Sequence, residues 1–414
     1  MSGSFKFLVL TALFIQPTAC SEKEAAPEGP RSSTDFCGKQ CGDCGAGTWV
    51  CQEDGLVCQG PSSRIDDVDP VLGLKPAETG LREVFNPEDF DGVPARRIQK
   101  AADAAGTVGG AVVLEKIYDI AHAIRLPDGI MVTGGGLRRT CGAVANVMNP
   151  PALKKDSVCF PVDSTEGFTL GEAVQLLVDE TTAGNLGVVA LDSVADGELC
   201  VSNDVDGLLS KGVAKIFRVR NMVLGKTSWS DKIVIDSVFF DGSNRCNSAS
   251  HDWRIANTLS IRGDNTVRNS IFVDTPSENI TACRGVFEDN FAMDLQGSFI
   301  HISCLPKDQG PEVIRRNVVL EANLAGDEVM RHSEGLITFS ANSGDIEMEE
   351  NIFIGGNEGV FGRAGPDDEG ILSVGDCYKD FPRIMQVYNG ADESTFVFQD
   401  LELIQVPEKI IPLF

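Results

Sequence analysis

The chain has 414 residues, of which 42% are hydrophobic and 23% charged, a composition typical of globular proteins. Its length allows one large domain together with smaller ones. The formal net charge of −26 excludes the broad basic surface of nucleic-acid-binding proteins. It should also repel polyanionic glycans and anionic membranes, except where a local basic patch or a bound Ca²⁺ intervenes.

The N-terminal residues predict an exported protein. The run Phe7–Ile15 is apolar apart from one Thr, too short to span a bilayer, and fits the core of a signal peptide over residues 1–19. The small residue before Cys20 resembles the bacterial lipobox, although Pro17 stands where Leu is usual, and the resemblance implies lipidation of Cys20. Residues 20–36 are charged and suit a tether. We expect a lipid-anchored protein at the outer membrane or cell surface; an ordinary signal peptide is the alternative.

Thirteen cysteines in an exported chain predict disulfide bonds. Residues 37–60 form a cysteine-rich module with five of them, so one of the five should pair with a cysteine of the later domain. A zinc site is the alternative for this module, although it lacks His and a second CxxC pair. The spacing of Cys283 and Cys304 suits a bond between adjacent repeats. The cysteines expected in disulfides are Cys37, Cys41, Cys44, Cys51, Cys58, Cys159, Cys200, Cys283 and Cys304.

Five similar segments recur in the second half of the chain: VIDSVFFD, VRNSIFVD, FEDNFAMD, IRRNVVLE and MEENIFIG. Each has Ser or Asn before an apolar triplet, at Ser237, Ser270, Asn290, Asn317 and Asn351. Their spacings of 20 to 34 residues match the rungs of a β-solenoid. Because Asn tolerates a left-handed backbone, we expect these residues to occupy a sharp bend between two short strands.

Alternation along the strand after each bend predicts two faces. The inward set is Val238, Phe240, Ile271, Val273, Phe291, Met293, Val318, Leu320, Ile352 and Ile354. The outward row is Phe239, Phe272, Ala292, Val319 and Phe353, which is too apolar for a solvated face. We therefore expect the apolar segment from Thr395 to Phe414 to cover this row; a partner protein is the alternative.

The segment PARRIQKAADAAG, from Pro94 to Gly106, predicts an amphipathic helix with one apolar face. Such a helix can cover the open strand edge at the end of a solenoid. The segments GGAVVLEKIYDI and AIRLPDGIMVTGGG then predict the first rungs.

These segments together resemble the pectate lyase-like superfamily. DGV…IQKAADAAG…GGAVVLEKIYDI…LPDG is similar to its opening, and the rungs from Ile233 to Gly355 are similar to its body. The resemblance implies an all-β, right-handed parallel β-helix over roughly Asp91 to Asp376. It says little about the reaction, because the superfamily includes lyases, hydrolases, epimerases, phage tailspikes and inert surface proteins.

The predicted domain boundaries follow from these patterns. Residues 88–156 should form the first part of the β-helix with its capping helix, 157–221 an inserted small β-barrel, 222–380 the main β-helix and 381–414 a C-terminal cap. The phrase GFTLGEAV resembles the barrel inserted between rungs in some members of this fold, and Cys159 and Cys200 would brace it. A set of irregular additional rungs is the alternative.

The first strand of each rung provides a candidate binding face. TLSIRG, NITACRG, FIHISC and LITFSA align so that the inward residues are Leu259, Ile261, Ile280, Ala282, Ile300, Ile302, Ile337 and Phe339. The outward row is then Ser260, Thr281, His301 and Thr338. Glycan-active members of the superfamily commonly place their cleft over this sheet. A floor with Glu278, His301 and Arg262 would lie between two long turns, which carry His251, Asp252, Trp253 and Arg254, and Glu328, Arg331, His332 and Glu334.

Histidine and arginine together can bind a sugar carboxylate and move a proton near neutral pH. A β-elimination would need His301 as the base for the C5 proton and Arg262 or Arg284 as the cation. The other catalytic candidates are His251 and Asp252. The substrate-binding candidates are Trp253, Arg254, Glu278, His332 and Glu334. The alternatives are a solvated His301 and a Trp253 that only anchors its loop.

Four acidic residues, Asp241, Asp274, Asp294 and Glu321, follow the repeated strand in successive rungs. Like charges stacked at about 5 Å repel unless a cation or solvent intervenes. They predict a Ca²⁺ site or an acid/base pair for hydrolysis, with a solvated turn column as the alternative. No other cofactor is expected. The NTD, GDD and GHG motifs of polygalacturonases are absent, and so is the DPHD motif of mannuronan epimerases.

Three functional hypotheses remain open. One is a polysaccharide lyase or related glycan-active enzyme, the second a non-catalytic binding or adhesion protein, and the third a structural envelope protein. The expected partners are a polysaccharide or cell-surface glycan and, through the lipid anchor, the membrane. We expect no nucleic acid partner and a monomeric chain.

Overall fold

The computed structural model describes the strands of the cysteine-rich part and most of the chain from residue 68 onward. The described residues are 40–41, 47–52, 55–59, 68–120, 123–140, 144–154, 157–168, 170, 173–177, 185–202, 212–218, 222–225, 232–242, 257–275, 278–302, 312–322, 335–339, 345–356, 360–362, 371–379, 383–388, 396–404 and 408–413. The chain divides into two compact units, Met1–Asp67 and Val68–Phe414.

The first unit contains a three-stranded antiparallel sheet. Its strands are β1 (Gln40–Cys41), β2 (Gly47–Gln52) and β3 (Gly55–Gln59), in that order. Cys41, Cys51 and Cys58 lie on these strands, whereas Cys37 and Cys44 lie outside the described residues.

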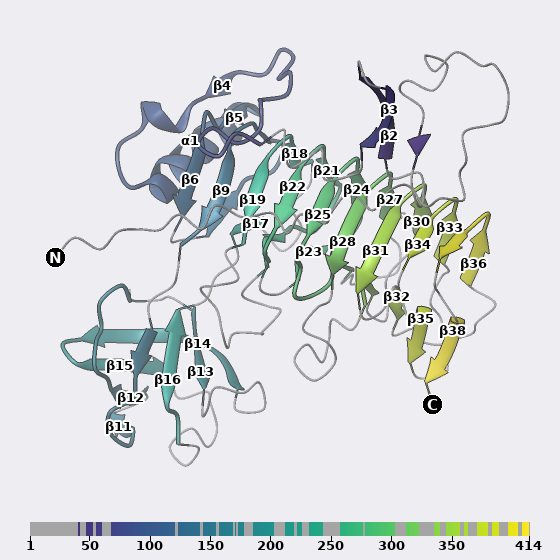
Figure 1. The fold of residues 1–414 in the computed structure, drawn as a ribbon. Coiled ribbons are helices and arrows are strands. Elements are labelled where there is room, and N and C mark those ends of the chain that lie inside the picture. Colours follow the sequence, from purple (N-terminus) through teal and green to yellow (C-terminus); the bar gives the residue numbers. More distant parts are fainter. Residues whose placement is uncertain are drawn as a thin grey trace, which may run out of the picture. The chain divides into compact units, whose positions relative to one another are not determined.

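The second unit is built on three parallel sheets (Figure 1). Sheet 1 contains β4 (Val84–Phe85), β5 (Ala111–Val113), β8 (Met131–Thr133), β18 (Val234–Asp236), β21 (Asn265–Arg268), β24 (Gly285–Glu288), β27 (Glu312–Arg315), β30 (Ile346–Glu349), β33 (Ile371–Val374) and β36 (Phe396–Gln399). Sheet 2 contains β6 (Ile117–Ile120), β9 (Gly136–Arg139), β19 (Phe239–Asp241), β22 (Ile271–Val273), β25 (Phe291–Met293), β28 (Val318–Ala322), β31 (Ile352–Gly356), β34 (Cys377–Lys379) and β37 (Glu402–Ile404). Sheet 3 contains β7 (Ile124–Leu126), β17 (Val223–Gly225), β20 (Leu259–Ser260), β23 (Ile280–Ala282), β26 (Ile300–Ile302), β29 (Ile337–Phe339), β32 (Val360–Gly362), β35 (Arg383–Tyr388) and β38 (Glu408–Leu413).

The chain visits sheets 1, 2 and 3 in turn and then starts the next rung, as β18, β19 and β20 are followed by β21, β22 and β23. Each strand pairs in parallel with its counterparts in neighbouring rungs. This arrangement confirms the predicted right-handed parallel β-helix. Its interior is one continuous apolar core, because each strand turns alternate side chains inward.

Helix α1 (Pro94–Val108) packs on the first strands of the three sheets. It buries Ala95, Ile98, Ala101, Ala102 and Ala105 in the same core as β5, β6 and β7. Proline at its first position and Gly109 in a left-handed conformation at its end match the usual helix boundaries. A short 3₁₀ helix, η4 (Pro87–Asp89), precedes it and is capped by the Asn86 side chain.

Sheet 2 corrects the predicted inward row. The left-handed residue at the bend is the one before Ser or Asn, as at Asn269 (φ 50°) and Asp289 (φ 57°). The Ser and Asn side chains are therefore buried in the corner, and the alternation after them is reversed. The core row on sheet 2 is Leu137, Phe240, Phe272, Ala292, Val319, Phe353 and Tyr378.

The first repeat is offset by one residue from the others. Ser237 itself has the left-handed backbone (φ 58°), and the residue in register with Ser270 is Val238, whose N–H donates to Ser270 Oγ. Phe240 consequently stacks on Phe272, with ring centroids 4.9 Å apart. Phe272, Ala292, Val319 and Phe353, predicted to face outward, are thus core residues.

An asparagine ladder runs along the corner between sheets 1 and 2. The Oδ1 atom of Asn317 accepts hydrogen bonds from the backbone N–H and from Nδ2 of Asn290, and its Nδ2 donates to the Phe287 carbonyl. Asn351 repeats this pattern one rung later. The series ends at Asp376, in the position of the next Asn. Buried amides thus satisfy the backbone groups of each corner.

Residues 395–414 were predicted to cover a face of sheet 2. The structure shows that they do not. Strands β36, β37 and β38 instead add to sheets 1, 2 and 3. The C-terminal residues therefore continue the β-helix by a further rung.

An antiparallel sheet is inserted between β9 and β17. Its strands are β10 (Val144–Asn146), β11 (Ala152–Lys154), β12 (Ser157–Pro161), β13 (Ala173–Leu177), β14 (Asn185–Ala195), β15 (Glu198–Ser202) and β16 (Lys215–Arg218), in the order β10-β16-β13-β14-β15-β12-β11. A bridge between Val147 and Val162 links the ends of β10 and β12. The sheet has its own apolar core around Phe160, and it begins earlier than the predicted residue 157.

Candidate functional site

The polar row on sheet 3 has the predicted register. Ser260 pairs with Thr281, Thr281 with His301, and His301 with Thr338. The predicted inward residues of these strands are all core residues: Leu259, Ile261, Ile280, Ala282, Ile300, Ile302, Ile337 and Phe339. The alternation therefore places this row on the opposite side of sheet 3 from the core.

The row is buried rather than open to solvent. The exposed fractions of Thr281, His301 and Thr338 are 2%, 3% and 2%, and Ser260 is half-buried. The sequence predicted an open cleft floor, with a solvated His301 as the alternative, and neither describes this arrangement. Burial makes hydrogen bonding within the row necessary, because an unpaired buried polar group costs about 1–3 kcal/mol.

Glu278 and His301 form a buried pair. Glu278 lies two residues before β23, is fully buried, and its Oε1 contacts Nδ1 of His301 on the next rung. The Thr281 hydroxyl donates to Oε2 of Glu278 at 3.0 Å. Both carboxylate oxygens therefore have a partner, as a buried carboxylate requires. Glu278 thus links two rungs of sheet 3, through Thr281 on its own rung and His301 on the next.

Three similar bonds run diagonally across successive rungs. In each, the residue two positions before a sheet 3 strand bonds to the outward residue of the next rung's strand. Asn257 Nδ2 donates to Thr281 Oγ1, Glu278 contacts His301, and the hydroxyls of Ser298 and Thr338 lie 2.7 Å apart. We call these three pairs the diagonal series. Only its middle pair is titratable, which distinguishes Glu278 and His301 from a simple structural ladder.

Arg139, at the end of β9, extends this network. Its Nη2 donates to the backbone carbonyl of Asn257 at 3.1 Å. Burial lowers the pKa of this guanidinium to about 10, and the charge of Asp241 partly offsets the effect. A buried cation thus lies on the same network as the buried Glu278–His301 pair, and strongly desolvated charges of this kind are enriched at functional sites.

Sequence reasoning missed Asn257 and Arg139. A signal for Asn257 existed, because Asn257, Glu278 and Ser298 are polar residues at the same position before three aligned strands. Arg139 had no such signal, since it lies 118 residues from Asn257 and on the other side of the insert.

The two predicted cations, Arg262 and Arg284, both lie in connections between sheet 3 and sheet 1: Arg262 after β20 and Arg284 directly before β24. Arg262 is half-buried and follows Ser260 by two residues. Arg284 has a left-handed backbone (φ 58°) at the corner between β23 and β24, and its Nε lies 2.5 Å from Oδ1 of Asp264. The structure thus engages Arg284 with an aspartate, whereas no ion pair of Arg262 occurs among the described residues.

The acidic column is a turn position, and Asp241 is not part of it. Asp274, Asp294 and Glu321 are in register and all have left-handed backbones, which Asp tolerates. Asp241 is offset by one residue, pairs with Val273, and accepts from Arg138 Nε at 3.0 Å. Burial, with a smaller effect from Asp294, raises the pKa of Glu321. The predicted four-residue column is therefore wrong, and Ca²⁺ binding by the remaining three stays a prediction.

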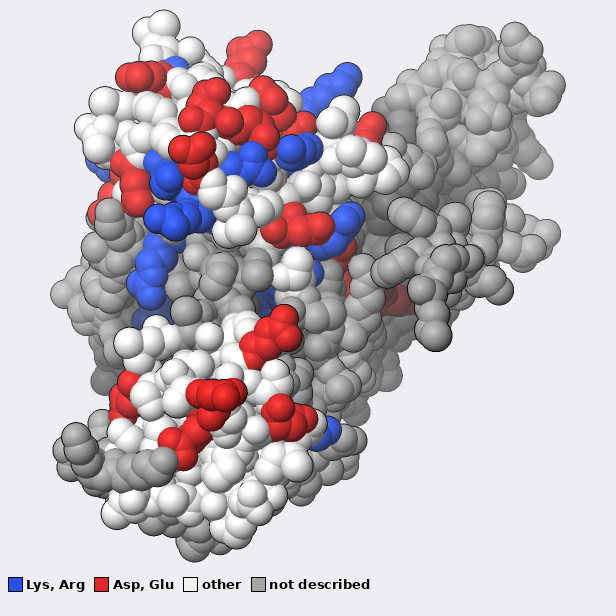
Figure 2. Space-filling model, turned by 90° about the vertical axis from the view of Figure 1, so that its left-hand side faces the viewer, with Lys and Arg blue, Asp and Glu red and all other residues white. Residues whose placement is uncertain are grey.

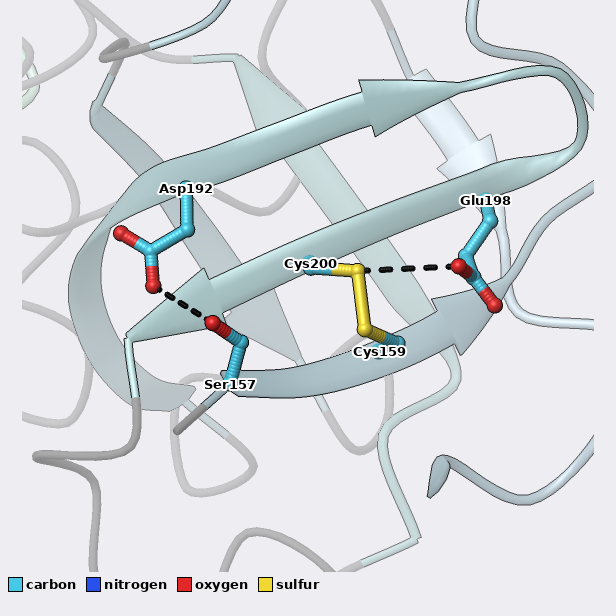
Figure 3. The surroundings of a disulfide bond; sticks show 5 residues. All are labelled: Ser157, Cys159, Asp192, Glu198 and Cys200. Atoms are coloured by element: carbon cyan, nitrogen blue, oxygen red, sulfur yellow. Dashed lines mark hydrogen bonds between the residues drawn. A yellow bond between two sulfur atoms is a disulfide. The ribbon is translucent and has the colours of Figure 1, made fainter. Parts of the chain in front are cut away.

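Among the described residues, the one cluster of three potential metal ligands is Cys159, Glu198 and Cys200. Its two sulfurs form a disulfide between the paired strands β12 and β15, as predicted (Figure 3). Glu198 Oε1 lies 3.7 Å from Cys200 Sγ, and Ser157 donates to Asp192 at 2.9 Å nearby. The disulfide occupies the sulfur ligands, so this cluster supports the inserted sheet.

Several predicted residues lie outside the described residues. These are His251, Asp252, Trp253, Arg254, Glu328, Arg331, His332 and Glu334 of the two expected walls, together with Cys20 and Cys304. Cys283, the predicted partner of Cys304, is disulfide-bonded, and so is Cys377.

Acidic and basic side chains are intermixed on the face shown in Figure 2. Near α1, Arg97 and Lys116 both pair with Glu88, at 2.7 and 3.0 Å. The described part of this face thus carries charges of both signs. Within the described residues, no helix combines the length and apolar character needed to cross a membrane.

Comparisons with known proteins find solved structures at low sequence identity. No protein-family profile and no curated protein matches the chain. The complex of XylC with xylose aligns with 74% of this chain and 62% of its own, at 9% identity and a TM-score of 0.42. The chain thus spans less than two thirds of that structure.

Two further solved structures cover more of their own length. The exopolygalacturonase of Thermotoga maritima matches 84% of this chain and 92% of its own, at 9% identity and a TM-score of 0.39. The A-module of the Azotobacter vinelandii mannuronan C-5 epimerase AlgE4 matches 80% and 98%, at 13% identity and a TM-score of 0.34.

Proposed function

We propose that the protein binds a polysaccharide along the outer side of sheet 3 and acts on it through His301 and Glu278. The observation that carries this proposal is the fully buried Glu278 in contact with His301 on a rigid scaffold of parallel strands. A structural ladder needs only neutral partners, as Ser298 and Thr338 show one rung later. Burying an ionisable pair there costs desolvation energy. Because such buried ionisable groups are enriched at functional sites, we assign the pair a role in proton transfer.

The reaction that suits this pair is a β-elimination on a uronic acid. His301 would take the C5 proton through Nε2 while the C4–O bond breaks and a C4=C5 double bond forms. The electron pair of the C4–O bond leaves with the oxygen, which then takes up a proton. Glu278 would stabilise the imidazolium that results, because a carboxylate beside Nδ1 favours the protonated ring.

A cation beside the sugar carboxylate would lower the energy of the charge that develops during proton removal. Arg262 fits this role better than Arg284. Arg262 follows the half-buried Ser260 at the end of the row where the side chains become accessible, whereas Arg284 is paired with Asp264. Arg125, which is exposed and on the same outward row, lies three rungs before Thr281.

A panel of neutral and acidic polysaccharides tests this proposal by equilibrium binding, with and without Ca²⁺. We expect saturable binding of an acidic glycan that is weakened in Arg262→Ala. The matched control is Thr266→Ala, a half-exposed residue on the outside of sheet 1. Equal binding by both variants, or no binding to any glycan, would contradict the proposal.

Non-catalytic glycan binding or adhesion is the second candidate function. The observation that favours it is the near-complete burial of Thr281, His301 and Thr338, which leaves the His301 ring little access to a bound glycan. Saturable binding without any product from the bound glycan would support this candidate over the lyase.

We also propose export and lipid anchoring at Cys20, on the basis of the N-terminal sequence. Mass spectrometry of the N-terminal peptide should find a diacylglycerol-modified Cys20, and Cys20→Ser should release the protein from the membrane fraction. An unmodified N-terminus at another position would contradict the anchor.

A further inference from the structure

The Glu278–His301 pair is held by Thr281, on the same rung as Glu278, and by Asn257, on the rung before. We propose that Thr281 and Asn257 are positioning residues that fix the Glu278 carboxylate, and thereby the tautomer of His301. The effect on catalysis rests on the proposed function. The positioning of the Glu278 carboxylate depends only on the hydrogen bonds of the fold. Thr281 and Asn257 are as buried as the pair that they would orient, with exposed fractions of 2% and 1%.

The direction of each hydrogen bond follows from the donors available. The Nδ2 of Asn257 can only donate, so Thr281 Oγ1 accepts from it. The single hydroxyl proton of Thr281 is then directed to Oε2 of Glu278, at 3.0 Å. When Glu278 is a carboxylate, both of its oxygens accept, and the proton in its contact with His301 is then carried by Nδ1 of the imidazole.

The series is also anchored at its start. Arg139 Nη2 donates to the backbone carbonyl of Asn257. This bond restrains Asn257, whose side chain is the first donor in the series that continues through Thr281 to Glu278. Hydrogen bonds then lead from β9 through Asn257, Thr281 and Glu278 to His301. Because the residues come from successive rungs, small shifts between rungs are resisted by parallel backbone pairing. Such second-layer bonds are how a carboxylate fixes the orientation of an imidazole.

The next rung provides an internal comparison. Ser298 takes the position of Glu278 there and bonds to Thr338. This bond has the same place in the diagonal series but carries no ionisable group. Ser298→Ala should therefore remove a similar hydrogen bond without altering the orientation of Glu278, and it is the matched control.

The test is long-range ¹H–¹⁵N correlation of the imidazole nitrogens in the full chain, which has four histidines. Loss of signals in His301→Asn assigns the ring. We expect one tautomer, protonated at Nδ1, in the unmodified protein and in Ser298→Ala. Thr281→Val should give a mixture of tautomers, and Thr281→Ser should restore the original spectrum.

An unchanged tautomer in a folded Thr281→Val would overturn the proposal, even if that variant melts at a lower temperature. Should Thr281→Val not fold, Asn257→Ala takes its place with the same expected direction. On any glycan that the protein cleaves, Thr281→Val should lower kcat and leave KM unchanged. Absence of all glycan activity would contradict the proposed function, while the imidazole spectra would still decide the positioning role.

Discussion

Oδ1 of Asp376 accepts two hydrogen bonds from Asn351, one from its backbone N–H at 2.7 Å and one from Nδ2 at 2.9 Å. Asp376 thereby closes the asparagine ladder with a carboxyl group where the other rungs have an amide. Ser373 donates to the second oxygen, and burial still raises the pKa of the carboxyl to about 6. The last corner of the ladder is therefore its pH-sensitive corner.

Asp376→Asn should stabilise the protein near neutral pH. A carboxyl whose folded pKa is raised from 3.8 to about 6 binds its proton more tightly when folded, so stability falls as pH rises through that range. The loss is about 1.4 kcal/mol per pH unit at most. The amide cannot ionise, and its Nδ2 can donate to a backbone carbonyl as Asn351 does to Ile314.

Urea unfolding at pH 4 and pH 7 measures this effect, with the exposed Asp400→Asn as the control. Asp376→Asn should be more stable than the unmodified protein at pH 7 and close to it at pH 4. The same difference at both pH values would show that Asp376 is not the titrating group.

Glu312→Gln should stabilise the protein above pH 7. Glu312 is buried in β27 with neither carboxyl oxygen in a hydrogen bond to a side chain, and desolvation raises its pKa to about 8. Its folded pKa lies above the unfolded value of 4.5, so the wild-type chain loses stability between pH 4.5 and about 8, again by about 1.4 kcal/mol per unit at most. Gln removes this loss.

Thermal unfolding between pH 5 and pH 9 checks this prediction, and the exposed Glu347→Gln on the neighbouring strand β30 is the control. We expect the gain in Tm for Glu312→Gln to grow with pH up to about 8 and then to level off. A gain that is independent of pH would mean that Glu312 is ionised throughout.

Phe272→Ala should cost far more stability than Val273→Ala. Phe272 is fully buried in the core row and stacks on Phe240, whereas Val273 is half-buried on the outer side of β22. Removing a core phenylalanine typically costs about 3–5 kcal/mol. We expect about 1 kcal/mol or less for the half-buried valine. Denaturant titration of both variants measures the two costs, and a reversed order would restore the alternation predicted from sequence.

Glu278→Ala and His301→Ala should each destabilise the protein by about 3–5 kcal/mol, because each leaves a buried polar partner unsatisfied. The double variant should lose less free energy of unfolding than the sum of the two single variants, because it leaves neither Glu278 nor His301 without its partner. A double-mutant cycle in urea measures this coupling. Strict additivity would show that the two side chains do not interact in solution.

The periodicity of the chain was enough to predict the β-helix and the register of sheet 3. TLSIRG, NITACRG and FIHISC alternate plainly, so their inward and outward residues follow from the pattern. The inward and outward residues of sheet 2 were harder to predict. Ser and Asn can either adopt a left-handed backbone at the bend or turn their side chains inward to form a hydrogen-bonded ladder. The choice between the two moved the triplet side chains to the opposite face in four of the five repeats, as expected for a period of two, whereas Val238 and Phe240 of the first repeat face inward as predicted.

The candidate site was only partly predictable. His301 and Glu278 were found as polar residues near one sheet, but their contact depends on a diagonal offset between rungs that spacing alone does not give. Arg139 reaches the network from a strand that precedes the insert. Burial of the row was also unpredicted, because alternation along a strand gives the side on which a residue lies and not its exposed fraction.

The most direct test of the proposed function is product formation from the polysaccharide that the protein binds best. Unsaturated uronate ends, formed when the C4=C5 double bond appears, absorb in the ultraviolet and can be followed in time. We expect the purified protein and Ser298→Ala to form this product, and His301→Asn to form little or none. No product from the unmodified protein, or equal rates in His301→Asn, would contradict catalysis at the Glu278–His301 pair.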